Sequence, residues 1–114
     1  ALDAKRSDVY ARFFSPLLEP ASPPLALPPD ELVAMIGADR LLVAGDASAR
    51  VAEVASQRGV NAVISNAPGV ADAAIVAAVA ARRHRAGEAG EPAEPLYLRP
   101  PDVTMSPNSG RLRP

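Results

Sequence analysis

The first part of the chain has the alternating pattern of β-strands. Residues 2–14, LDAKRSDVYARFF, contain two apolar stretches separated by the polar cluster AKRSD, which predicts a β-hairpin. In its second strand Val9, Ala11 and Phe13 fall on one face, and the residues between them fall on the other. A proline-rich segment follows, so we expect only a short edge strand there, PLALP, at residues 24–28.

Helices and strands alternate in the middle of the chain. A helix is predicted to begin at Pro29, where proline costs no backbone hydrogen bond, with Leu32 and Val33 on its apolar face. The run RLLVAG, residues 40–45, is typical of a strand that is buried on both faces and therefore parallel to a neighbour. A second helix is predicted from an N-cap at Ser48.

The pattern continues with VNAVIS, residues 60–65, which predicts another short strand. A long helix over residues 68–86 follows, and Asn66 is its expected N-cap. The apolar stripe of this helix comprises Ile75, Val76 and Val79. The order, three strands and then alternating helices and strands, indicates an α/β domain with one core, and we expect residues 104–114 to form a disordered tail.

Composition narrows the classes of function only a little. The net charge is −1, which provides no general attraction for nucleic acid or an anionic membrane. There is no cysteine, hence no disulfide or thiolate metal site. We expect no membrane segment and a cytoplasmic location.

Three places could carry chemistry, and each has a simpler structural interpretation. The turn AGDASAR, residues 44–50, could hold a phosphate at a helix amino terminus, but it lacks the glycines and lysine of the known phosphate loops, so an ordinary turn is the better interpretation. Arg82, Arg83, His84 and Arg85 could contact RNA, or simply be cations favoured at a helix carboxyl terminus. Asp3 and Asp8 flank the hairpin turn and could form a carboxylate pair for acid-base chemistry or for magnesium, but aspartate is common beside turns for local hydrogen bonding.

Two segments resemble a known family. LDAKRSDVYARFF and AEPLYLRPPDV, residues 93–103, resemble the sequences that flank the carboxyl-terminal half of the bacterial TsaB family, also called YeaZ-like and long labelled glycoproteases. The resemblance covers residues 2–103, which we take as one subdomain, residues 1–103. The matching positions, for which we expect structural roles, are Asp3, Tyr10, Glu94, Pro95, Tyr97, Leu98 and Arg99.

The resemblance implies half of an actin-like ATPase (ribonuclease H-like) fold, with an amino-terminal subdomain ahead of Ala1. It implies a non-catalytic partner subunit without cofactor or metal, which acts with a TsaD-like catalytic subunit and a TsaE-like ATPase. Together these transfer a threonylcarbamoyl group to the adenosine next to the anticodon of tRNA, which such a subunit meets only indirectly. The resemblance also implies that the ring of Tyr97 locks the last segment down and that Arg99 pairs with a carboxylate or a helix end.

Two other interpretations stay open. The chain could be a fragment of an actin-like-fold enzyme, a glycoprotease-type hydrolase or a kinase relative, whose catalytic residues lie in the missing half. An Asp-x-Gly segment with metal-ligand histidines upstream of Ala1 would favour that enzyme. A free-standing ligand-binding α/β domain is the third possibility. For the half-domain we also expect self-association through the edge left without its neighbour.

Overall fold

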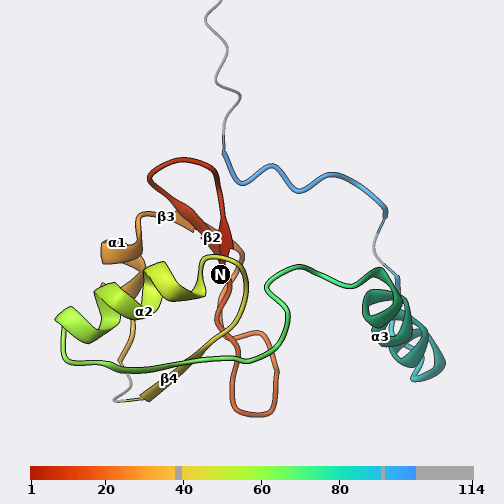
Figure 1. Ribbon diagram of the computed structural model, residues 1–114. Helices are drawn as coiled ribbons and strands as arrows, with labels where there is room; N and C mark the ends of the chain where they lie inside the picture. The colour runs from red at the N-terminus through yellow and green to blue at the C-terminus, as the bar shows by residue number, and fades with distance from the viewer. Residues whose placement is uncertain (38–39, 91, 100–114) are drawn as a thin grey trace, which may run out of the picture.

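The computed structural model describes residues 1–37, 40–90 and 92–99 of the 114-residue chain. Figure 1 shows the elements in their spatial arrangement. In chain order they are β1 (Leu2–Asp3), β2 (Val9–Ala11), β3 (Leu25–Leu27), α1 (Pro29–Ala34), β4 (Arg40–Val43), α2 (Ser48–Gln57), β5 (Asn61–Ile64) and α3 (Ala73–Arg85). The predicted mixed α/β order, an antiparallel hairpin followed by helices and strands, is confirmed. The expected tail, residues 104–114, lies outside the described residues.

The first three strands form an antiparallel sheet in the order β1-β2-β3. Leu2 pairs with Tyr10 and Asp3 with Val9, which confirms the predicted hairpin. Val9 is fully buried, and Ala11 and Phe13 pack against the core on the same face, as the alternation predicts. The strand predicted within residues 24–28 is present as β3, at the edge of the sheet.

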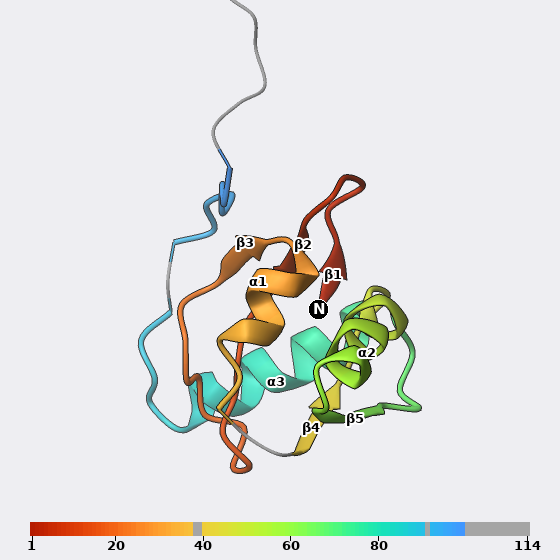
Figure 2. The same ribbon diagram turned by 90° about the vertical axis from the view of Figure 1, so that its left-hand side faces the viewer.

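The core lies between the strands and two helices that pack against each other, α1 and α2 (Figure 2). Leu32 and Val33 of α1 meet Val51 and Ala55 of α2, and Val43 of β4 completes the same cluster. These are the positions that share one face of each helix in the sequence, so helical periodicity selects this part of the core correctly.

Strands β4 and β5 pair in parallel, as predicted, but β4 is not buried on both faces. Val43 is buried, whereas Leu42 is 68% exposed. The expectation of two covered faces is therefore wrong. α2 packs on the face that carries Leu41 and Val43, and nothing among the described elements packs closely on the other.

Ala1 links the two sheets. Its nitrogen donates a hydrogen bond to the carbonyl oxygen of Ala44 at 2.6 Å, and its carbonyl oxygen accepts one from the amide of Ala47 at 3.3 Å. Gly45 lies beside Ala1 and has a φ of +110°. A Cβ atom on Gly45 would overlap the Ala1 carbonyl oxygen. Glycine is thus required at this junction for both conformation and space.

The long helix begins later than predicted. α3 starts at Ala73, and its N-cap is Asp72, whose carboxylate accepts from the amide of Ala74 at 2.8 Å. Asn66 is therefore not the cap. The loop before α3 lies against the turn after β4. A Cβ atom added to Gly69 in this loop would lie only 3.1 Å from Cα of Asp46 in the turn. Because this contact holds the loop in a non-helical path, the helix begins only after it.

α3 stands away from the rest of the molecule (Figure 1). None of its residues is buried, and Ile75 and Val76 are 62% and 58% exposed. Within the described ranges, no helix has the length and apolar character needed to cross a bilayer.

Candidate functional site

The tip of the first hairpin is held by two arginines from distant parts of the chain. Arg50, on α2, donates from Nη1 to the carbonyl oxygen of Arg6 at 3.2 Å and from Nη2 to that of Ser7. Arg99 donates from Nη2 to Oδ2 of Asp8, and these two side chains are only 26% and 16% exposed. We call residues 6–8 with Arg50 and Arg99 the hairpin clamp.

The clamp gives Asp8 a structural partner. Oδ1 of Asp8 accepts from the hydroxyl of Ser7 at 3.0 Å, while Oδ2 accepts from Arg99. The hydrogen bond from Arg99, and then that from Ser7, lowers the pKa of the Asp8 carboxyl below its ordinary value. The carboxylate is therefore engaged in its charged form by neighbouring donors.

Asp3 has a local role at the base of the same turn. Its Oδ1 accepts from the amide of Lys5 at 2.8 Å, and Oδ2 lies 3.3 Å from the Lys5 ammonium nitrogen. The amide hydrogen bond from Lys5, followed by that of its side chain, lowers the pKa of Asp3. Since Asp3 and Asp8 each have their own donors, they fit the structural interpretation better than an acid-base pair.

The turn after β4 also bonds within the protein. The carboxylate of Asp46 accepts from the amide of Asp3 at 2.8 Å. The amide of Ala47 donates to Ala1, and that of Ser48 donates to the carbonyl of Gly45 at 3.2 Å. An anion would find two of the amides engaged and a carboxylate beside them, so an ordinary turn is the interpretation that fits.

The same bonds explain a wrong prediction. Ser48 is not the N-cap of α2; that position is Ala47, with no side-chain cap. The backbone carbonyls of Ala1 and Gly45 already accept from the amides at this end of the helix.

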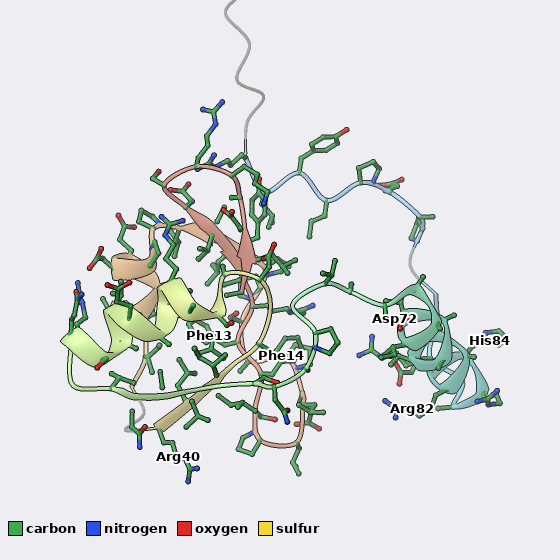
Figure 3. All side chains as sticks on the ribbon, viewed as in Figure 1. Phe13, Phe14, Arg40, Asp72, Arg82 and His84 are labelled. Atoms are coloured by element: carbon green, nitrogen blue, oxygen red, sulfur yellow. The ribbon has the colours of Figure 1, made fainter. Side chains whose placement is uncertain are left out.

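The basic cluster lies at the end of α3, far from the hairpin clamp. Arg82, Arg83, His84 and Arg85 occupy its last turn, and Figure 3 shows Arg82 and His84 on this outlying helix. Nε of Arg83 is 3.7 Å from the Glu88 carboxylate. Cations here complement the negative end of the helix dipole. Within the described part of the chain, no three residues of metal-ligating type gather into a potential site.

The carboxyl-terminal segment returns to the hairpin through Arg99 and not through its tyrosine. The expectation that the ring of Tyr97 locks the segment is wrong, since Tyr97 is 84% exposed. Glu94 and Pro95 are also exposed, whereas Leu98 and Arg99 are half-buried. The sequence resemblance predicts a carboxylate or a helix end as the partner of Arg99. The partner is a carboxylate, that of Asp8.

Sequence reasoning missed Arg50. It is one arginine among those of a helix surface, and no pattern distinguishes it before the fold brings it to the tip of the hairpin. Among the positions that match the family, Asp3 and Tyr10 lie in the hairpin and Arg99 contacts it. Glu94, Pro95 and Tyr97 are exposed.

No family model, curated protein or solved structure matches this chain.

Proposed function

We propose that the chain is the carboxyl-terminal half-domain of a TsaB-like scaffold. In this proposal the parent protein is non-catalytic and cytoplasmic, and it supports transfer of a threonylcarbamoyl group to tRNA by binding a TsaD-like catalytic subunit and a TsaE-like ATPase. The half-domain itself has no cofactor and meets tRNA only indirectly.

The contact between Asp8 and Arg99 is the observation that carries the proposal. The resemblance rests on two segments at opposite ends of the sequence, which have no reason to meet unless they belong to one structural unit. Asp8 lies in the first segment and Arg99 in the second, and they form a half-buried ion pair across 91 positions. A shared unit is what the resemblance requires.

The order of strands gives further support. β3, β2 and β1 are neighbours, Ala1 bonds to the end of β4, and β4 pairs with β5. The chain thus has three antiparallel strands followed by alternating helices and parallel strands. This is the order expected for half of an actin-like ATPase fold, to which we assign the chain as part of the proposal.

A scaffold role also agrees with the chemistry of the candidate residues. The carboxylates of Asp3, Asp8 and Asp46 are each bonded to protein donors. In the proposed scaffold these hydrogen bonds fix the shape of the hairpin and of the turn after β4.

Reconstitution with single omissions tests the proposal. Purified parent protein, TsaD-like subunit, TsaE-like ATPase, ATP, a threonylcarbamoyl donor and tRNA are combined, and modified adenosine is measured. We expect modification to fall to background when the parent is omitted. The parent alone should hydrolyse neither ATP nor a glycoprotein.

Two results would overturn the proposal. Full modification without the parent would remove its role in the transfer. ATP hydrolysis or peptidase activity by the isolated parent, retained in the absence of the other subunits, would instead favour the actin-like-fold enzyme.

A further inference from the structure

The tip of the first hairpin carries an exposed serine. Ser7 lies in the turn between β1 and β2, where Lys5, Arg6 and Ser7 are all exposed. The hydroxyl of Ser7 donates a hydrogen bond to Oδ1 of Asp8 at 3.0 Å. An enzyme can therefore reach this hydroxyl from solvent, and the only bond it must displace is to a neighbouring side chain.

The two arginines of the hairpin clamp approach this serine from distant parts of the chain. Arg50 donates from Nη1 to the carbonyl oxygen of Arg6 at 3.2 Å and from Nη2 to the carbonyl oxygen of Ser7 itself. Arg99 donates from Nη2 to Asp8, the residue that accepts from the Ser7 hydroxyl. Guanidinium groups thus lie on both sides of Ser7, and guanidinium is the side-chain group that binds phosphate best.

The sequence before the serine is also basic. Lys5 and Arg6 precede Ser7 directly, and Lys5 is held in the turn at a φ of +59° with its ammonium nitrogen 3.3 Å from the carboxylate of Asp3. Protein kinases select their substrates partly by the charge pattern around the acceptor hydroxyl. A basic pair before the acceptor matches a kinase with an acidic substrate cleft.

Other serines of the chain lack this combination. The hydroxyl of Ser15 accepts from the amides of Leu17 and Glu19, both at 3.2 Å, so it holds its own loop together. Ser56 is exposed near the end of α2, where the negative end of the helix dipole opposes a phosphate. Ser7 is therefore the serine at which an added phosphate meets arginines already in place.

We propose that Ser7 is a phosphorylation site and that its phosphate binds Arg50 and Arg99 of the hairpin clamp. A protein kinase transfers the γ-phosphoryl group of a nucleoside triphosphate to Oγ of Ser7. The bond from Oγ to phosphorus forms as the bond from phosphorus to the bridging oxygen breaks, the nucleoside diphosphate leaves, and the hydroxyl proton passes to the base of the kinase. This modification does not depend on the proposed function.

The phosphate strengthens the attachment of residues 92–99 to the hairpin. A phosphoserine carries a charge of about −1.5 to −2 at pH 7 and accepts several charge-assisted hydrogen bonds. It replaces the hydroxyl bond to Asp8 with repulsion between two anions, which a guanidinium group between them offsets. Because Arg99 belongs to residues 92–99, a second anionic partner for Arg99 holds this segment more firmly.

Phosphorus NMR on the full chain tests the phosphate site. Phosphoserine is incorporated at position 7 in one protein and at position 56 in the control. We expect the second pKa of the phosphate to be lower at position 7 by about 0.5 or more, because the arginines favour the dianion. Arg50→Gln together with Arg99→Gln should remove the difference. Equal phosphate pKa values at positions 7 and 56 would overturn the proposal.

Limited proteolysis of the same proteins tests the consequence. Phosphoserine at position 7 should slow cleavage within residues 92–99 at least about three-fold relative to the unmodified chain, and phosphoserine at position 56 should leave the rate unchanged. Faster or unchanged cleavage with phosphoserine at position 7 would contradict the proposed contact with Arg99.

Mass spectrometry of the protein isolated from its own cells tests whether the modification occurs. We expect a phosphorylated peptide that contains Ser7, is lost after phosphatase treatment and is missing from Ser7→Ala. Ser7→Ala should keep the circular dichroism of the unaltered chain, since Asp8 retains its bond from Arg99. An unmodified Ser7 in both growing and stationary cells would overturn the assignment.

Discussion

Arg99 and Asp8 make the residue-scale contact on which the account depends. Reversing one charge, as in Arg99→Asp, places two carboxylates side by side and should release the segment 92–99 from the hairpin. We expect faster proteolytic cleavage in this segment. The double variant Asp8→Arg with Arg99→Asp restores opposite charges and should slow cleavage again. Equal cleavage rates in all three proteins would contradict the contact.

The same contact should depend on acid. The pKa of Asp8 is lowered in the folded chain, so its charged carboxylate stabilises the contact with Arg99. This contribution is fully present above the ordinary pKa of aspartate. It is lost as pH falls through the lowered pKa of Asp8. Cleavage of the segment should therefore accelerate below that pH in the unaltered chain. In Asp8→Asn it should be fast at every pH.

Sequence reasoning was most successful for residues whose roles depend on local pattern. The hairpin faces follow from alternation, and the sequence marks both Asp8 and Arg99 as candidates, although it does not show that they contact each other. The expectation for Tyr97 is wrong because the sequence around a ring between prolines does not indicate what the ring contacts. The Tyr97 side chain is mostly exposed. Arg50 gave no signal because its partners are backbone carbonyls 43 and 44 positions away.

At the scale of elements, the start of α3 shows that a good N-cap residue in the sequence does not by itself decide where a helix begins. Asn66 and Asp72 are both good N-cap residues, and only the structure distinguishes them. We expect Asp72→Ala to lower helix stability by about 0.5–2 kcal/mol, measured as lost helical circular dichroism on heating. Asn66→Ala is the matched control and should change little. The reverse ranking would place the cap where the sequence alone suggested it.

The elements themselves were largely predictable, whereas their surroundings were not. Proline at the first turn fixed the start of α1, and apolar runs located β4 and β5. The sequence also indicated a doubly covered β4, since its run of Leu41, Leu42 and Val43 is continuous. Whether a second face is covered is a matter of long-range packing and not of local pattern.

At the scale of the whole molecule, segments far apart in the sequence are joined by a few polar contacts, which agrees with the proposed half-domain that supports a neighbour. Asp8 meets Arg99 at the hairpin clamp, the two sheets join at Ala1, and the candidate carboxylates have donors of their own. This arrangement favours a protein that works through its surfaces. Exposed apolar side chains outside the core lie on α3 and on β4.

Association with a TsaD-like subunit tests the central proposal most directly. The tagged parent protein is co-expressed with the TsaD-like protein of the same organism and purified, and the composition of the complex is measured by sedimentation. The account predicts a stable complex of the two proteins that forms without ATP. Two separate species, under conditions in which an established TsaB and TsaD pair associates, would contradict it.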